Sequence, residues 1–287
     1  MSRIAYVNGC YVPHREARVH IDDRGYQFAD GVYEVIAVER GALVDEGLHL
    51  NRLNRSLSEL RIAQPMAAGA LKVVMREVIR RNRVSDGIIY IQMTRAVAPR
   101  DHAFPKHPKT QMVMTSRRTR LANPKLDAEG VAVITIPDLR WERCDIKSIS
   151  LLPNILGKQQ AREAGAYEAW QVDRDGNVTE GTSTNAWLVT AAGEVVTRQA
   201  NHAILNGITR LGVMHVIEQE GLSLVERPFS VGEAKDAREA FLTSTTAYVT
   251  PVVRIDAAAV GEGKPGALTG KLRDYYARYV AAGGQDS

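Results

Sequence analysis

A mixed α/β fold (α+β) of two domains is predicted by three observations on the amino-acid sequence. The chain has 287 residues, of which 45% are apolar and 24% charged, as in an ordinary globular protein with room for two cores. Segments with the period of an amphipathic helix are mixed with segments that alternate like strands. A polar stretch at residues 117–124 ends in Asn-Pro and separates two such series. We therefore expect a smaller α/β domain at residues 1–119, a linker at 120–124 and a larger domain at 125–287.

Local patterns predict the elements of the first domain. Apolar residues flank Asn8-Gly9, which predicts a hairpin over residues 4–12 with a type I′ turn. Strands are expected at residues 31–39, 87–97 and 111–116. Leucines at helical spacing predict a helix over residues 48–60, and a second helix is expected at 68–83.

The second domain is expected to contain more strands than helices. The strands are predicted at residues 130–136, 167–173, 184–190, 194–197 and 240–243. The helices are predicted at residues 153–164, 208–220 and 267–282, and the final residues 283–287 are expected to fray.

Composition argues against several functional classes. The net charge of +4 comes from arginines scattered along the chain, so nucleic acid binding is not favoured. No apolar run reaches the roughly 18 residues of a membrane-spanning helix, and the N-terminus lacks the apolar core of a signal peptide. We therefore expect a cytoplasmic protein that does not bind a membrane. Cys10 and Cys144 are too few for a disulfide framework or a zinc site, and Cys144 is expected to be an inert packed thiol.

A lysine and a glutamate in two polar motifs suggest the chemistry of pyridoxal 5'-phosphate. Lys147 lies in Asp145–Ser148, and Glu180 lies in Thr179–Asn185. A lysine amine can hold an aldehyde cofactor as a Schiff base and later move a substrate proton. A carboxylate at the pyridine nitrogen keeps that ring protonated as an electron sink. Taken alone, Lys147 would more often be a solvated surface residue and Glu180 a turn or cap residue.

Three groups of residues are candidates for binding a phosphate. Arg52 directly precedes a core-facing leucine, so its side chain could lie at the edge of the core; the alternative is an exposed arginine. Gly207-Ile208-Thr209 begin a predicted helix, whose first N–H groups carry partial positive charge. Asn206 could also simply cap that helix. Ser244 and Thr245 follow a predicted strand, where hydroxyl groups are often no more than turn residues.

Two pairs of residues are placed to contact a substrate. Tyr33 and Val35 share one face of a predicted strand, because side chains two residues apart point the same way. Arg100 and His102 alternate in a loop that flanking prolines keep extended, so they could hold an anion together. From spacing alone, a solvated loop is the alternative, and a metal site at His102 and His107 is less favoured still.

The motifs taken together resemble the fold-type IV pyridoxal phosphate enzymes. This group contains D-amino acid transaminases, branched-chain transaminases and aminodeoxychorismate lyases. The resemblance covers nearly the whole chain, because separate motifs occur in the order found in the family. These motifs are Asp23–Glu34, Asp145–Ser148, Thr179–Asn185, Leu205–Arg210 and Phe241–Thr246.

The resemblance implies a fold, a cofactor and site residues. The fold would be a small α/β domain with a larger pseudo-barrel domain. Pyridoxal 5'-phosphate would be bound to Lys147, with Glu180 at the pyridine nitrogen. The cofactor-binding positions would be completed by Arg52 and Thr245 at the phosphate and Leu205 on the ring, beside Gly207, Ile208, Thr209 and Ser244.

Within the family, the substrate positions look like those of D-amino acid transaminases. There, residues matching Tyr33, Arg100 and His102 bind the α-carboxylate, and the last two reach in from a neighbouring subunit, which implies a homodimer. The implied reaction transfers the amino group of D-alanine, and of other D-amino acids, to 2-oxoglutarate to give pyruvate and D-glutamate. The alternatives are a branched-chain L-amino acid transaminase or an aminodeoxychorismate lyase. A cofactor-free binding protein on the same scaffold should have lost Lys147.

Overall fold

The computed structural model describes residues 3–284, in which the chain divides into two compact units. The first unit contains residues 3–120 and 146–150, and the second contains residues 121–145 and 151–284. The short segment 146–150 therefore belongs to the first unit, although its neighbours in sequence belong to the second. The expected fraying of the C-terminus falls largely on residues 285–287, which lie outside the described residues.

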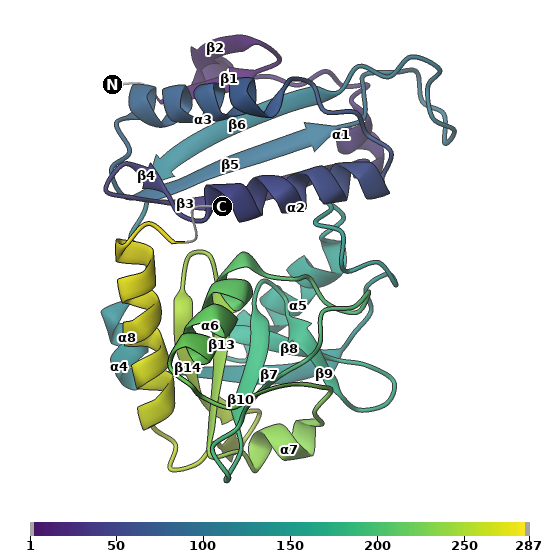
Figure 1. The fold of residues 1–287 in the computed structure, drawn as a ribbon. Coiled ribbons are helices and arrows are strands. Elements are labelled where there is room, and N and C mark those ends of the chain that lie inside the picture. Colours follow the sequence, from purple (N-terminus) through teal and green to yellow (C-terminus); the bar gives the residue numbers. More distant parts are fainter. Residues whose placement is uncertain (1–2, 285–287) are drawn as a thin grey trace. The chain divides into compact units, whose positions relative to one another are not determined.

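The first unit is built on a six-stranded antiparallel sheet with the order β2-β1-β6-β5-β3-β4 (Figure 1). Val7 pairs with Cys10, and both turn residues have positive φ, 47° at Asn8 and 101° at Gly9, which confirms the predicted type I′ hairpin. The strands are β1 (Ile4–Val7), β2 (Cys10–Pro13), β3 (Gly31–Glu39), β4 (Ala42–Leu43), β5 (Gly87–Thr94) and β6 (Gln111–Arg118).

The strand predicted at residues 87–97 ends earlier, at Thr94. Beyond it the backbone pairs with the segment that precedes β3: Arg95 N donates to Asp30 O at 3.1 Å, and Ala98 N donates to Asp22 O at 3.2 Å. That segment includes the short helices η1 (His14–Glu16) and α1 (Arg24–Phe28), which periodicity did not predict because each is too short to show it.

Two helices cover one face of this sheet, as Figure 1 shows. They are α2 (Glu46–Glu59) and α3 (Ala68–Asn82), close to the predicted ranges. Because side chains alternate along β3, Val32, Glu34 and Ile36 point toward the helices while Tyr33 and Val35 point to the opposite face. Leu53 and Met75 are among the helix residues in the core, with sheet residues Ile89, Ile91, Met112 and Met114.

The second unit contains a curled nine-stranded sheet. Its order is β12-β11-β10-β13-β14-β7-β8-β9, with β15 beside β14. Residues 182–184 alone connect β9 to β10, although β13, β14, β7 and β8 lie between them in the sheet. The sheet must therefore curl into a half-barrel. The strands are β7 (Val131–Pro137), β8 (Glu168–Val172), β9 (Val178–Gly181), β10 (Asn185–Val189), β11 (Val195–Thr197), β12 (Leu224–Glu226), β13 (Glu239–Ser244), β14 (Tyr248–Ile255) and β15 (Ala258–Ala259).

Helices pack on the outside of this sheet and at its ends. Alternating residues of β7 separate two clusters, because Val133 packs with Trp170 and Leu242 while Ile134 packs against Ala161 of α5. α6 packs on α8 and β13. The helices are α4 (Pro124–Glu129), α5 (Leu152–Glu163), α6 (Ile208–Gln219), α7 (Val231–Lys235) and α8 (Ala267–Ala281).

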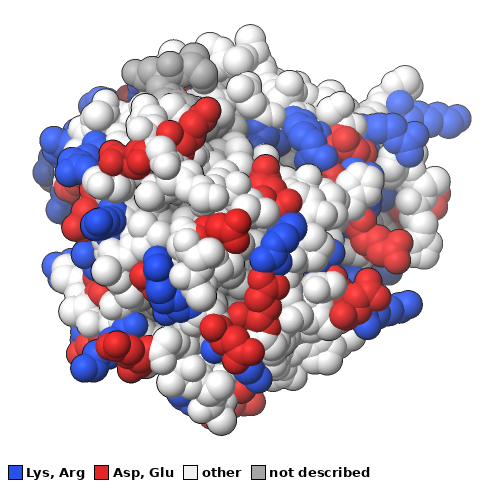
Figure 2. Space-filling view, turned by 60° about the horizontal axis from the view of Figure 1, so that its bottom comes forward, with Lys and Arg blue, Asp and Glu red and all other residues white. Residues whose placement is uncertain are grey.

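Charged side chains are mixed on the visible surface. Figure 2 shows a face on which lysine and arginine alternate with aspartate and glutamate rather than forming a basic patch. Within residues 3–284, no helix is both long and apolar enough to span a membrane.

Candidate active site

Lys147 is fixed to the first unit through its backbone. Tyr33 N donates to Lys147 O at 3.0 Å, and Lys147 N donates to Ser56 Oγ at 3.3 Å. The Lys147 ammonium lies 4.3 Å from the centre of the Tyr33 ring, and the described residues include no carboxylate paired with it. The structure thus brings together two of the predicted residues, a half-buried amine and a tyrosine, on the sheet face that α2 and α3 leave open. Val35 lies on that same face of β3.

Arg52 belongs to a buried ionic cluster on the helix-covered face of the same sheet. Its Nε and Nη2 donate to the two carboxylate oxygens of Glu34 at 2.7 and 2.8 Å, and His49 Nδ1 lies 2.8 Å from Glu34 Oε2. Burial alone would raise the pKa of Glu34, but Arg52 and His49 hold it well below its usual range. Sequence reasoning missed Glu34, although a charged residue between Val32 and Ile36 on a core-facing side was a usable signal.

Acid should destabilise the first unit through His49. Burial lowers the pKa of His49, so the folded protein holds a neutral imidazole that donates to Glu34, whereas the unfolded chain takes up a proton near pH 6.5. The contribution of neutral His49 to the free energy of unfolding is fully present above the pKa that histidine has in the unfolded chain. It is lost as the pH falls below that pKa. Below pH 6.5, the free energy of unfolding should fall by up to about 1.4 kcal/mol per pH unit until the lowered pKa of the folded state is reached.

The control is His49→Asn, whose amide can donate to Glu34 but does not titrate. Urea unfolding of both proteins from pH 5 to 8 should give a shallower pH dependence for the variant. Parallel curves would contradict a neutral buried His49.

Arg100 and His102 lie in an exposed loop of the first unit. The Arg100 guanidinium lies 4.5 Å from the Phe28 ring centre, and the His102 ring lies 5.5 Å from it. Among the described residues, neither contacts Tyr33 or Lys147 by a hydrogen bond, ion pair or ring contact. The structure therefore brings these two together around Phe28, and it does not join them to the lysine of the same chain.

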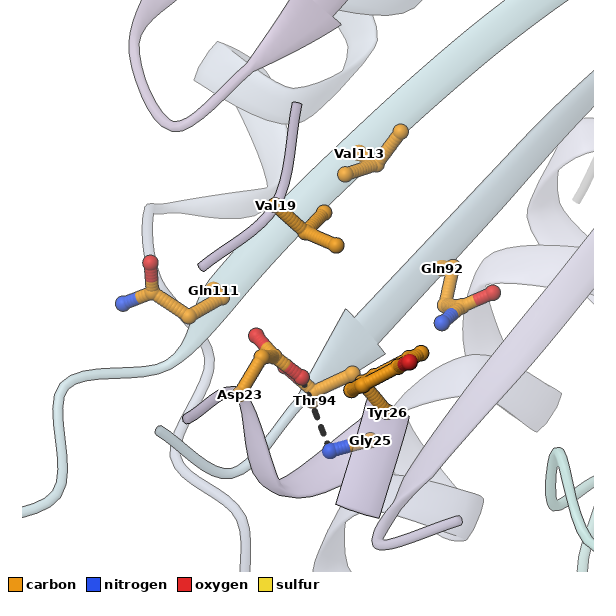
Figure 3. Close-up of a pocket in the computed structure, with 8 residues that line it drawn as sticks. All are labelled: Val19, Asp23, Gly25, Tyr26, Gln92, Thr94, Gln111 and Val113. Carbon is orange, nitrogen blue, oxygen red and sulfur yellow. Dashed lines mark hydrogen bonds between the residues drawn. The ribbon is translucent and has the colours of Figure 1, made fainter. Parts of the chain in front are cut away.

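A shallow pocket of about 150 Å³ lies on the sheet face opposite the helices. Figure 3 shows the Asp23 carboxylate beside Thr94, accepting a hydrogen bond from Gly25 N at 2.8 Å. None of the predicted site residues lines it. The lining residues are Val19, Asp23, Gly25, Tyr26, Gln92, Thr94, Gln111 and Val113.

In the second unit, the Glu180 carboxylate is held by a ring of donors. Leu205 N donates to both oxygens at 3.1 and 3.2 Å, and Asn185 Nδ2 donates at 3.0 Å. Arg140 Nη1 forms a short ion pair with Glu180 Oε1. A buried carboxylate beside a guanidinium remains an acceptor for further N–H groups.

Sequence reasoning also missed Arg140. It is almost fully buried, and its Nε and Nη2 donate to the Asp138 carboxylate at 2.9 and 2.7 Å. Burial would lower the pKa of Arg140, but Glu180 and Asp138 raise it above its usual value, so the cation is permanent. The exposed Leu139 and Trp141 on either side give this stretch the appearance of a surface loop.

The start of α6 presents donors suited to an anion. Gly207 is the N-cap residue of the helix and has no side chain with which to cap the first turn, and Asn206 Oδ1 accepts a hydrogen bond from Arg210 at 3.1 Å. A Cβ at Gly207 would lie 2.1 Å from Asn185 Oδ1, so only glycine fits. Ile208 and Thr209 therefore offer N–H groups, with the Thr209 hydroxyl nearby. Because Asn185 contacts both Gly207 and Glu180, these predicted residues form one group.

Ser244 and Thr245 lie in the turn between β13 and β14. Ser244 Oγ accepts a hydrogen bond from Ala247 N at 3.2 Å, which is the ordinary role of a turn hydroxyl. No hydrogen bond among the described residues joins either one to Glu180 or to the start of α6. Burial raises the pKa of the half-buried Cys144 thiol to about 12, which agrees with the expected inert thiol.

Comparison with known proteins identifies the family. The model of the amino-transferase class IV family matches residues 31–255. The chain belongs to this family. The family predicted from the order of the motifs is thereby confirmed.

Named relatives and solved structures extend the comparison. The chain is 40% identical to a D-alanine aminotransferase of Staphylococcus haemolyticus over 96% of this chain and 97% of the relative. It is 42% identical to a D-alanine aminotransferase of Bacillus licheniformis, over 91% and 92% of the two chains.

The structural neighbours share the fold. A branched-chain amino acid aminotransferase of Escherichia coli superposes with a TM-score of 0.90 at 22% identity, covering 100% of this chain and 97% of that one. A branched-chain aminotransferase of Thermoproteus uzoniensis, with norvaline, superposes with a TM-score of 0.86 at 26% identity, covering 98% and 96%. The predicted α/β fold with a pseudo-barrel is therefore confirmed.

Proposed function

We propose that this class IV aminotransferase uses pyridoxal 5'-phosphate to transfer the amino group of D-alanine to 2-oxoglutarate, giving pyruvate and D-glutamate. The observation that carries the proposal is the similarity to D-alanine aminotransferases, at 40% identity over 96% of the chain. We further propose that other D-amino acids are accepted, and that the enzyme is a cytoplasmic homodimer.

The residues present fit this cofactor. Lys147 supplies an amine without a carboxylate partner in the described chain, Glu180 supplies a buried acceptor, and the start of α6, with glycine at its N-cap, supplies N–H donors. When bound, the cofactor acts as an electron sink for charge that develops at the substrate Cα. Leu205 would contact its ring. Ser244 and Thr245 would complete the contacts to its phosphate, together with Arg52, whose guanidinium Glu34 holds at the helix-covered side of the sheet.

Lys147 and Glu180 would have separate roles. Lys147, held by backbone hydrogen bonds to Tyr33 and Ser56, would bind the cofactor aldehyde and then move the proton at the substrate Cα. Glu180 would accept a hydrogen bond from the pyridine nitrogen. The buried Arg140 guanidinium pairs with this carboxylate.

Arg100 and His102 would bind the substrate α-carboxylate together with Tyr33. In the described chain these two residues make no hydrogen bond or ring contact with their own Tyr33 or Lys147. This supports a role in the site of a second copy. Val35 would border the substrate side chain, since it shares a strand face with Tyr33.

A branched-chain L-amino acid aminotransferase is the second candidate, because a structural neighbour at 26% identity is named a branched-chain aminotransferase. Turnover of paired enantiomers separates the two. With 2-oxoglutarate as acceptor, D-alanine and D-leucine should react faster than L-alanine and L-leucine. Faster turnover of the L-isomers would reject the proposed function.

A further inference from the structure

We propose that Arg24 and Phe28 are positioning residues that hold residues 99–104 so that Arg100 and His102 can bind a substrate carboxylate. The inference rests on the proposed function, which assigns Arg100 and His102 to that carboxylate. Arg24 and Phe28 are the first and last residues of α1, and they contact the loop by different means.

Arg24 binds the backbone of the loop on both sides of His102. Its side chain is 4% exposed, and its Nη1 donates to Asp101 O at 2.5 Å and to Ala103 O at 3.3 Å. Nη2 donates to His102 O at 3.4 Å. The Asp101 carboxylate accepts a hydrogen bond from Ala103 N at 3.1 Å, so the loop is turned to present three consecutive carbonyls to one guanidinium.

The burial of Arg24 depends on this loop. Asp30 accepts from Arg24 Nε at 2.8 Å and from Arg95 Nε at 2.8 Å, so two buried guanidinium groups share one carboxylate. Arg95 also donates to the carbonyls of Leu60 and Arg61. The remaining positive charge of Arg24 is stabilised by the loop carbonyls. Because a buried cation without acceptors is strongly destabilising, order in the loop and burial of Arg24 are coupled.

The Phe28 ring contacts both residues that are predicted to bind the substrate carboxylate. Its ring centre lies 4.5 Å from the Arg100 guanidinium carbon and 5.5 Å from the centre of the His102 ring. The side chains of Arg100, Asp101, His102 and Ala103 are themselves exposed, so the loop contributes no core of its own there. Phe104 holds the end of the loop, because its ring centre lies 3.5 Å from the Arg95 guanidinium carbon, and the contacts from α1 hold the part of the loop that carries these two side chains.

The test compares two reagents, of which only one carries a carboxylate. Aminooxyacetate and O-methylhydroxylamine would displace the Lys147 amine from the cofactor through the same aminooxy group, each forming an oxime, and only the first carries a carboxylate that can use the site. In the holoenzyme, Arg24→Lys and Phe28→Leu should each lower the ratio of their second-order rate constants by about tenfold or more, because a misplacement of about 1 Å can cost roughly 10²-fold. Phe28→Tyr, which keeps the ring, should restore the ratio.

Arg76→Lys is the matched control. Arg76 donates to both carboxylate oxygens of Glu46 on an exposed helix surface of the same unit, and it makes no contact with the loop among the described residues, so the ratio should not change. A second readout needs no bound substrate. Limited trypsin digestion should cleave after Arg100 and Lys106 faster in Arg24→Lys and Phe28→Leu than in the wild type.

The outcomes distinguish this inference from the proposed function. If Arg100→Ala leaves the reagent ratio unchanged, the carboxylate assignment itself fails. If Arg100→Ala lowers the ratio while Arg24→Lys and Phe28→Leu keep wild-type ratios and wild-type cleavage, the positioning roles are wrong. If Arg24→Lys does not fold, Phe28→Leu decides alone, since it leaves the buried ion pairs intact.

Discussion

Lys147→Ala should lower the turnover of D-alanine by about 10²–10⁴-fold or more, the range for removing a positioned acid–base group, with the loss of covalent exchange added to it. The expected effect is large because Lys147, whose backbone is hydrogen-bonded to Tyr33 and Ser56, would supply both the covalent attachment of the cofactor and the group that moves the proton. Steady-state assays with D-alanine and 2-oxoglutarate measure the loss. Without cofactor, the thermal stability of the variant should stay near that of the wild type, because the lysine forms no ion pair within the described residues.

Lys125→Ala is the control for this substitution. Lys125 is 74% exposed at its side chain and forms only a surface pair with Glu129, so its removal should leave turnover unchanged. Borohydride reduction of the wild type, followed by peptide mapping, should find the cofactor attached to Lys147. Attachment to Lys158 or another lysine would show that the catalytic assignment is wrong.

Local patterns correctly predicted the elements whose signal lies within the element itself. The Asn8-Gly9 hairpin and the strand at Gly31–Glu39 were predicted correctly because the turn chemistry and the alternation are local properties. β14 (Tyr248–Ile255) was missed. Its first five residues are all buried, so it shows no alternation there, and Pro251 argues against a strand.

The predicted linker shows how a local signal can be ambiguous. Asn-Pro at residues 123–124 was interpreted as the end of a loop, but Asn123 accepts a hydrogen bond from Lys125 N, and Pro124 is the first residue of α4. Asparagine followed by proline is also a helix start, since proline needs no N–H partner at that position. The stretch is polar, as the interpretation of a connecting segment assumed, but the helix α4 that begins at its last residue was missed.

The candidate site could be predicted only where one motif carries the chemistry. Lys147, Glu180 and the start of α6 each stand in a short motif, whereas the partners of these residues come from distant parts of the chain. Arg140 reaches Glu180 across 40 residues, and Arg24 reaches the carbonyl of Asp101 across 77. Such long-range pairs depend on the order of strands in the sheet and on burial. Sequence periodicity reveals neither of these two properties.

Arg100→Ala should lower kcat/KM for D-alanine by roughly 10- to 200-fold, because a charge-assisted hydrogen bond contributes about 1.5–3 kcal/mol. Arg100→Lys should lower kcat/KM by a smaller factor, since an ammonium keeps the charge but lacks the planar guanidinium geometry that matches a carboxylate. Arg174→Ala, at an exposed turn of the second unit, is the control and should not change the kinetics. Wild-type kinetics in Arg100→Ala would remove the argument for a D-specific carboxylate site.

The same substitution tests whether the carboxylate site is completed by a second copy of the chain. If Arg100 serves the partner's lysine, a mixed dimer of Lys147→Ala and Arg100→Ala subunits has one site with both residues intact and one site with neither. Mixing two nearly inactive homodimers under exchange conditions should then restore activity at that one site. If Arg100 instead served its own Lys147, each site in the mixed dimer would lack one residue, and mixing would restore nothing. The absence of Arg100 contacts to Tyr33 and Lys147 among the described residues favours the first outcome.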